Sequence, residues 1–286
     1  MGRESGLAPG LYLVATPIGN ARDITLRALD VLRDADVLAA EDTRSLRRLM
    51  EIHGLAPGGR TFLAYHDHNG AKMRPRLLAE LAAGRSVAYA SEAGTPLVAD
   101  PGYQLVREAV AAGHAVTAAP GPSAALAALT VAGLPTDRFL FAGFLPPAAA
   151  QRRRSLGELA PVPATLVFYE SPRRLAAMLA DAAATLGHDR PAAVCRELTK
   201  RFEECRRAPL GELAETMAAT PVKGEVVVVV GRGRSETVSD SVLDEKLEAA
   251  LGTMSVRDAA DTVARETGAQ RRHVYQMALR KERGER

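Results

Sequence analysis

The stretch V-A-Y-A-S-E-A-G-T-P-L-V-A-D-P-G, from Val87 to Gly102, decides how the rest of the chain is interpreted. Its first four residues are apolar and predict a buried strand, which ends at Ser91 in a loop rich in glycine and proline. A helix pattern follows from about Tyr103. In open α/β sheets, ligands bind in loops at the carboxyl ends of the strands. The loop is therefore a candidate binding site, although an ordinary strand-to-helix connection fits the same pattern.

Strand and helix patterns alternate on the N-terminal side of this loop and directly after it. Apolar runs predict further strands at Leu11–Ala15, Val37–Ala40, Thr61–Tyr65 and Ala115–Ala119. Helical periodicity lies between them, at residues 23–34, 45–53, 72–83 and 103–112. This alternation predicts a mainly parallel sheet covered by helices, in an N-terminal α/β domain over residues 10–119.

The tripeptide Pro120-Gly121-Pro122 interrupts any regular element and predicts a domain boundary. A second α/β domain is expected over residues 120–232, opened by an alanine-rich helix that Ser123 caps. Strand signals follow at short spacings, which favour antiparallel pairing, so a mixed or antiparallel second sheet is expected. They lie at residues 139–143, 165–169, 192–196, 201–209 and, as five consecutive valines, 226–230.

Residues 242–286 are expected to form a small helical module of three helices after a polar linker, Gly231–Ser241. Ser255 and Asp258 form a capping box at the start of the second helix. A break between the second and third helices resembles a helix-turn-helix. The alternative is a helical cap, packed on the core through apolar residues such as Leu243, with a solvated basic face.

Composition excludes several classes of protein. The chain has 286 residues, of which 47% are hydrophobic, and a net charge of +3. No apolar run approaches the ~18–20 residues of a membrane span, and no secretory signal is expected at the N-terminus. Two cysteines, Cys195 and Cys205, are too few for a disulfide framework, so a reducing, cytoplasmic location is expected. No G-x-G-x-x-G follows the first strand, so a Rossmann dinucleotide site is not expected.

Ten short motifs occur in order along the chain. They are L-Y-L-V-A-T-P-I-G-N (11–20), D-I-T-L-R-A-L (23–29), A-A-E-D-T-R (39–44), H-D-H-N (66–69), S-E-A-G-T-P-L-V-A-D-P-G-Y (91–103), P-G-P-S-A (120–124), G-L-P-T-D-R-F (133–139), F-Y-E-S-P-R-R-L (168–175), R-E-L-T-K (196–200) and K-G-E (223–225). Together they closely resemble the ribosomal RNA small subunit methyltransferase I family, a group of tetrapyrrole-methylase-like enzymes. The similarity covers about residues 10–280, with one departure: the family often has Asp where this chain has Glu92.

The resemblance implies a fold and an activity. It implies two α/β domains with S-adenosylmethionine between them, a homodimer, and 2′-O-methylation of a cytidine in the decoding centre of 16S rRNA, in the small ribosomal subunit. No resident metal is implied. The cofactor-binding residues carried over from the family are Ile18, Gly94, Thr95, Pro96, Val98, Ser123, Ala124, Tyr169, Leu198 and Glu225.

A ribose hydroxyl is a poor nucleophile, so a general base or a cation is expected beside it. The candidate catalytic residues are Asp42, Arg44 and Glu92, and Glu41 and Lys200 also follow strands. For each of them, a helix cap or a surface ion pair is the alternative role. Residue order alone leaves the choice among these candidates open.

Contacts to RNA require clustered cationic side chains, and four arginine clusters are available. Any one of them alone is more often a solvated face than a binding site. The candidate RNA-binding residues are Arg47, Arg48, His66, His68, Arg152, Arg153, Arg154, Arg173, Arg271 and Arg272. The motif His66-Asp67-His68 also suggests a metal, but zinc takes three or four ligands and no further His/Cys cluster follows, so an RNA-contacting loop is favoured.

Two other functions compete with rRNA methylation. The first keeps the reaction and changes the acceptor to a tetrapyrrole of the precorrin type. The second is a non-catalytic nucleic-acid-binding protein that acts through residues 242–286. The T-P-I-G-N loop and the arginine clusters favour RNA over a tetrapyrrole, and the non-catalytic hypothesis leaves the loop motifs unexplained.

Overall fold

A computed structural model of the chain describes residues 6–66, 68–99, 102–233 and 240–283. The chain divides into two compact units. We call the first the α/β unit: it extends to Leu159, resumes over Thr165–Gly231 and contains both sheets. The second, the helical unit, contains the C-terminal helices and the short segment Ala160–Ala164. A boundary between residues 119 and 120 within the α/β unit stays a prediction.

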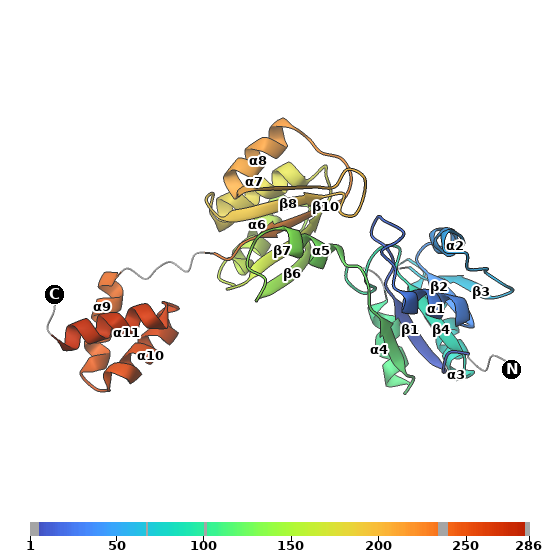
Figure 1. The fold of residues 1–286 in the computed structure, drawn as a ribbon, viewed down its shortest axis with the longest axis horizontal. Helices are drawn as coiled ribbons and strands as arrows, with labels where there is room; N and C mark the ends of the chain where they lie inside the picture. The colour runs from blue at the N-terminus through green and yellow to red at the C-terminus, as the bar shows by residue number, and fades with distance from the viewer. Residues whose placement is uncertain (1–5, 67, 100–101, 234–239, 284–286) are drawn as a thin grey trace. The chain divides into compact units, whose positions relative to one another are not determined.

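The first sheet has five parallel strands in the order β3-β2-β4-β1-β5 (Figure 1). Its strands are β1 (Gly10–Val14), β2 (Val37–Ala40), β3 (Thr61–Ala64), β4 (Ser86–Ala90) and β5 (Val116–Ala119). The helices between them are α1 (Leu26–Asp34), α2 (Thr43–Ile52), α3 (Gly70–Ala82) and α4 (Tyr103–Ala111). The predicted parallel sheet is therefore confirmed.

Successive residues of these strands point to opposite faces, and both faces are buried. Leu38 and Ala88 pack with α1 and α2 on one face, whereas Val37 and Val87 pack with α3 and α4 on the other. Because helices cover both faces, the strands are almost continuously apolar. This explains why the sequence shows short apolar runs rather than alternation.

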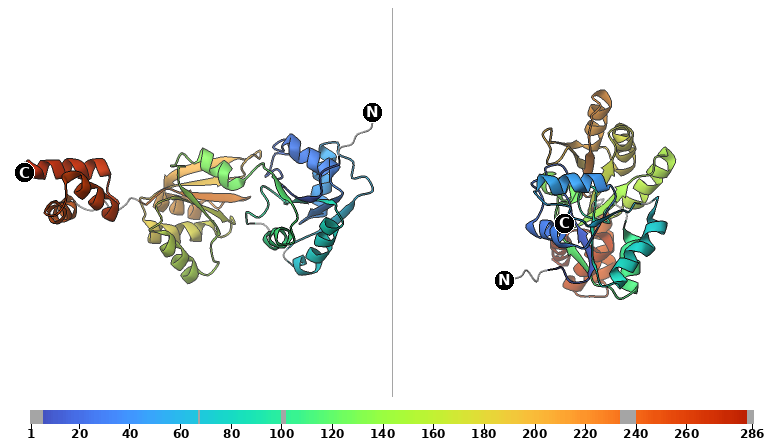
Figure 2. Two further views of the ribbon diagram at one scale, coloured as in Figure 1. Left: turned by 90° about the horizontal axis from the view of Figure 1, so that it is seen from below. Right: turned by 90° about the vertical axis from the view of Figure 1, so that its right-hand side faces the viewer.

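The second sheet has the order β6-β7-β10-β8-β9 and is mixed, as expected: β6 and β7 are parallel and the other pairs are antiparallel. Its strands are β6 (Phe139–Phe144), β7 (Thr165–Glu170), β8 (Pro191–Arg196), β9 (Glu204–Pro209) and β10 (Val226–Val230). Helix α5 (Ala124–Val131) covers one face. The helices α6 (Ala149–Leu159), α7 (Leu175–Leu186) and α8 (Leu210–Ala219) pack side by side on the other (Figure 2).

The caps of α1 and α5 differ from the sequence expectation. Helix α1 begins at Leu26 instead of residue 23, because the Thr25 side chain accepts the N–H of Ala28 and caps it there. Ser123 occupies the N-cap position of α5, but its side chain makes no capping hydrogen bond. The predicted N-cap position is therefore confirmed but the side-chain cap is not; the Tyr169 hydroxyl accepts the N–H of Ala125 instead, at 3.2 Å.

The helical unit has a hydrophobic core of its own. Its helices are α9 (Asp240–Leu251), α10 (Val256–Thr267) and α11 (Arg271–Glu282), which pack against one another (Figure 1). Leu243 and Leu247 of α9 are buried with Val263 and Val274 of the other two helices. The N-cap half of the predicted capping box is confirmed, since Ser255 accepts the N–H of Asp258 at 3.2 Å, while the Ser255 hydroxyl donates to Asp258 Oδ2 at 2.6 Å. The expected linker falls mostly at residues 234–239, outside the described residues.

Candidate active site

A cavity of about 1210 Å³ opens in the α/β unit at the carboxyl ends of β1, β2 and β4. Residues of both sheets line it, including the ends of β7 and β8 and the start of β10. Between β1 and β4, chain connections leave the first sheet in opposite directions, which is where ligands bind in open α/β sheets. The stretch from Val87 to Gly102 thus belongs to a cavity, although Asp100 and Pro101 lie outside the described residues.

Two loops are joined at this point of the sheet. Thr16, directly after β1, and Gly94, after β4, exchange backbone hydrogen bonds of 3.0 and 2.9 Å. The Thr16 side chain lies 3.1 Å from the carbonyl oxygen of Ser91, to which it donates. Gly94 has a φ of +83°, a conformation that favours glycine. The T-P-I-G-N loop and the G-T-P loop are therefore held as one rigid floor.

The same T-P-I-G-N loop contacts the second sheet. The backbone N–H of Asn20 donates to Thr199 Oγ1 at 3.1 Å, and a Cβ added at Gly19 would lie 2.4 Å from Lys200 Cγ. Glu197 and Thr199 have positive φ values of 50° and 64°. Such backbone strain is characteristic of functional sites. Glycine at position 19 is thus explained by the close approach of the R-E-L-T-K segment.

Lys200 lies at the cavity between two carboxylates. Its Nζ is 2.9 Å from Glu197 Oε1 and 3.0 Å from Glu225 Oε2. Burial alone would lower the pKa of Lys200, but the two carboxylates outweigh it and the pKa is raised. The N–H of Glu225, together with Lys200, lowers the pKa of Glu197. At neutral pH Lys200 therefore stays an ammonium group that pairs with Glu197 and Glu225.

Asp42 and Arg44 form an ion pair at the start of α2. Asp42 is the N-cap, accepting the Arg44 N–H at 2.8 Å, and Arg44 Nη2 lies 3.0 Å from Asp42 Oδ2. Hydrogen bonds from the Arg44 side chain and backbone lower the pKa of Asp42. Asp42 therefore does act as a helix cap and as an ion-pair partner. Asp42 and Arg44 both also line the cavity.

On the second sheet, Tyr169 also lines the cavity. Burial raises the pKa of its hydroxyl, which stays protonated. Ile18 from the first loop is buried with Leu198 and Ala125 in the same hydrophobic cluster as the Tyr169 ring. The two sheets thus share one apolar boundary at the cavity.

Most of the predicted cofactor-binding and catalytic residues line the cavity. Among the predicted cofactor residues, only Pro96 is not part of its lining, and Pro96 is buried. The candidate catalytic residues Asp42, Arg44 and Glu92 line it, as does Lys200, whereas Glu41 does not. Lining residues that the sequence interpretation missed include Thr16, Ser91, Phe144, Glu170, Ser171 and Cys195. Ser91 and Ser171 directly follow a strand, and that position was the available signal; Phe144 had none.

The predicted RNA-binding residues are more scattered. Arg48 lines the cavity, and Arg47 and Arg48 border a second hollow of about 620 Å³. The Arg47 guanidinium lies 3.7 Å from the Phe62 ring centroid. His66 is half-buried, and the exposed side chains are His68, Arg153, Arg154, Arg173, Arg271 and Arg272. Asp67 is outside the described residues; within the part of the chain that is described, no group of three His, Cys, Asp or Glu side chains could hold a metal ion.

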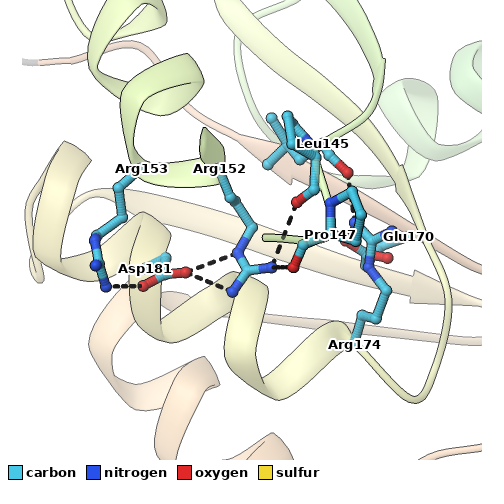
Figure 3. A network of polar contacts seen from close by, with 8 residues as sticks. Leu145, Pro147, Arg152, Arg153, Glu170, Arg174 and Asp181 are labelled. Atoms are coloured by element: carbon cyan, nitrogen blue, oxygen red, sulfur yellow. Dashed lines mark hydrogen bonds and ion pairs between the residues drawn. The ribbon is translucent and has the colours of Figure 1, made fainter. Parts of the chain in front are cut away.

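The prediction that Arg152 binds RNA is wrong. Its side chain is only 6% exposed, and Arg152 Nη2 lies 2.6 Å from Asp181 Oδ2 on α7 (Figure 3). Its Nη1 donates to the carbonyl of Pro147 at 3.0 Å, and Arg153 shares Asp181 at 3.2 Å. The run of three arginines lies on α6, so its members point to different sides of the helix. Arg152 faces the interior and is not available to RNA.

Two sequence patterns of known protein families match this chain. The sequence pattern of the tetrapyrrole (corrin/porphyrin) methylases matches residues 10–214, and that of the RsmI C-terminal HTH domain matches residues 237–282. Within the described residues, no helix is long and apolar enough to cross a membrane.

Two relatives of similar length are both ribosomal RNA small subunit methyltransferases I. Ribosomal RNA small subunit methyltransferase I of Mesorhizobium japonicum is 51% identical over 96% of this chain and 92% of its own. Its Pseudomonas aeruginosa counterpart is 43% identical over 95% and 97%. A solved structure of uroporphyrin-III C-methyltransferase from Thermus thermophilus, complexed with S-adenosyl homocysteine, shares the fold with a TM-score of 0.56 at 24% identity, over 78% of this chain and 97% of that one. The chain therefore belongs to the tetrapyrrole methylase family and, within it, to the ribosomal RNA small subunit methyltransferase I family.

Proposed function

We propose that this methyltransferase transfers a methyl group to the 2′-hydroxyl of a cytidine ribose in the decoding centre of 16S rRNA. The observation that carries the proposal is the cavity at the carboxyl ends of β1, β2 and β4, bordered by Arg44 and Arg48 on α2. Their side chains are 91% and 69% exposed, so they are available to phosphates. The identity to rRNA methyltransferases over both units supports the same substrate class.

Enzymes of this family use S-adenosylmethionine as the methyl donor, and the cavity has the properties that such a ligand needs. At about 1210 Å³ it exceeds the ~300–1,000 Å³ of ordinary small-molecule pockets, which leaves room for donor and nucleotide together. Gly94 contributes backbone without a side chain, so a ligand can approach closely. The residues proposed to hold the donor are the predicted cofactor residues that line the cavity: Ile18, Gly94, Thr95, Val98, Ser123, Ala124, Tyr169, Leu198 and Glu225.

When bound, S-adenosylmethionine supplies an already activated methyl group, so the task of the protein is to hold the attacking oxygen in line with it. Such positioning contributes up to ~7–11 kcal/mol in favourable systems. The rigid floor formed by Thr16 and Gly94 suits this role. The pKa of Asp42 is lowered, so it is a carboxylate but a weak base, and it is proposed, with Glu92, to accept the hydroxyl proton.

The function is tested by transfer of labelled methyl from S-adenosylmethionine to small ribosomal subunits isolated from cells that lack the enzyme. Free 16S rRNA and a porphyrinoid serve as alternative acceptors. The expected product is a single 2′-O-methylcytidine in the decoding centre, located by nuclease digestion and mass spectrometry. Transfer to the porphyrinoid alone would establish the tetrapyrrole alternative, and binding of RNA without any transfer would establish the non-catalytic one.

The exposed arginines of α6 are expected to serve RNA. Replacing Arg153 and Arg154 by Gln should weaken binding of small subunits and reduce the slope of log affinity against log salt by about 1–2, because each phosphate contact contributes ~0.7–0.9. Affinity for S-adenosylmethionine should not change. The control is Arg33→Gln with Arg85→Gln, two exposed arginines near the amino ends of the strands. If the two double variants have the same slope of log affinity against log salt, Arg153 and Arg154 are solvent-exposed residues that do not contact RNA.

The helical unit is proposed to add RNA affinity without contributing chemistry. A chain that ends at Gly233 should keep its melting temperature and its affinity for S-adenosylmethionine, because Leu243 and Leu247 are buried within the helical unit's own core. Its KM for small subunits should rise by at least ~10-fold, as expected when one of two linked binding modules is lost. A large fall in melting temperature would show a structural cap, and unchanged KM would exclude a role in binding.

Two further features rest on the family resemblance. A homodimer is proposed, and exposed apolar side chains such as Val110 on α4 and Leu126 on α5 are candidates for its interface. Sedimentation equilibrium would show a concentration-independent mass of twice 30.3 kDa if the dimer is stable. A ribosomal substrate would also place the enzyme in the cytoplasm.

A further inference from the structure

A β-bulge in β6 determines where Phe144 points. In the pairing of β6 with β7, Phe141 lies opposite Val167, but the next pairs are Gly143 with Phe168 and Phe144 with Tyr169. Ala142 is therefore the extra residue, and Gly143 has a φ of +63° that glycine adopts without strain. Bulges re-aim side chains and are over-represented next to active sites.

The bulge changes the face on which Phe144 lies. In a regular strand, residues 141 and 144 would point to opposite faces of the sheet. With one residue inserted, Phe141 and Phe144 both lie on the face of Tyr169. Their ring centroids are 4.8 and 5.7 Å from that of Tyr169, both edge-to-face. Phe144 thereby joins the lining of the cavity.

Phe144 is not required by the hydrophobic core. It is 57% exposed, whereas Phe141 beside it is partly buried against the α5 cluster. An aromatic ring that lines a cavity while remaining open to solvent has a free face for a flat ligand. Its edge-to-face contact with Tyr169 fixes the orientation of the ring in advance.

The residues that follow β7 place an exposed cation close to the cavity lining. Ser171 and Pro172 follow β7 and line the cavity, and the next residue, Arg173, is exposed. A stacking ring and a nearby cation are the combination that binds single-stranded nucleotides, with the base on the ring and the phosphate at the cation. The proposed donor site takes in the loops after β1 and β4 together with Tyr169, whereas Phe144 is not among its residues.

We propose that Phe144 is a stacking platform for the pyrimidine base of the nucleotide whose ribose is methylated, and so positions that ribose against the donor. The inference rests on the proposed function. Flipping the base out of its RNA stack requires a replacement surface, and the pre-oriented Phe144 ring supplies it. Phe144 is a positioning residue, since it acts on the base and not on the reacting oxygen.

The test is Phe144→Leu in the full chain, measured by methyl transfer to small subunits and by calorimetry with S-adenosylmethionine. Base–aromatic stacking is worth ~1–3 kcal/mol per base, so kcat/KM for the subunit should fall by about tenfold or more. Affinity for S-adenosylmethionine should stay within about twofold, since the donor does not need this ring. Phe144→Trp retains a flat aromatic face and should restore most of the activity.

The matched control is Phe139→Leu, at the start of the same strand, where the side chain is 43% exposed and does not line the cavity. It should leave both quantities unchanged. A parallel loss of donor affinity in Phe144→Leu would show that the ring stacks on the adenine of the donor. Unchanged kcat/KM would show that Phe144 takes no part in recognising the RNA. Either result overturns the proposal. Failure of the wild-type enzyme to methylate subunits would instead refute the proposed function itself.

Discussion

A Gly94→Val variant is expected to lose S-adenosylmethionine binding, with an affinity at least ~100-fold lower than that of the wild type. Gly94 has a φ of +83°, and a Cβ there would lie 3.3 Å from Ile18 Cγ2, which also lines the cavity. The branched side chain of valine would project further into the space proposed for the donor, and a β-branched residue is strained at positive φ. Isothermal titration calorimetry measures the effect directly.

The variant Gly113→Val is the control for backbone strain at positive φ without a steric contact. Gly113 follows α4 and has a φ of +78°, and a Cβ there would meet no atom within 4 Å. Both variants should lose stability through backbone strain, with a further loss in Gly94→Val from the contact with Ile18, but only Gly94→Val should lose donor binding. A folded Gly94→Val protein with wild-type affinity would place the donor site away from this loop.

The second large effect concerns stability. Asp181→Ala is expected to reduce the free energy of unfolding by about 3–5 kcal/mol, because it leaves the guanidinium of Arg152 buried without its carboxylate (Figure 3). The Arg152 side chain is 6% exposed and that of Asp181 13%, so water cannot replace the lost partner. Thermal melting of the variant should show a midpoint lower by roughly 10 °C.

An exposed pair on the same helix provides the control. Arg154 and Glu158 are 83% and 66% exposed, so Glu158→Ala should cost no more than ~0.5 kcal/mol. The double variant Arg152→Met with Asp181→Leu removes both charges and should recover most of the stability lost in Asp181→Ala. A loss in Asp181→Ala as small as that in Glu158→Ala would show that the buried pair contributes little.

Local patterns in the sequence were sufficient for the strands and for most helices, whereas helix α6 was not predicted. The apolar runs of the first sheet and the valines of Val226–Val230 were each assigned to strands, because burial on both faces requires continuous apolar residues. The loop at Gly94 was identified from its position after a strand. The capping box at Ser255 was also predicted, since it depends on two residues only three positions apart.

Which loops meet could not be deduced from such patterns alone. The bridge between Thr16 and Gly94 depends on β1 and β4 being neighbours in the sheet. The approach of Gly19 to Lys200 joins segments about 180 positions apart. These contacts follow from strand order and chain connection, which no short stretch encodes, and the resemblance to a known family supplied the residues in advance of any geometry.

The sequence by itself thus determined the strands, most of the helices, the family and the loops from which the site is built. The tertiary structure decided the direction of individual side chains. Arg152, which looked like part of a cationic surface, is buried because its turn of α6 faces Asp181. Phe144 reaches the cavity because a single extra residue in β6 reverses its face. Both outcomes depend on pairing with distant segments, and the identity of neighbouring residues carries no record of that pairing.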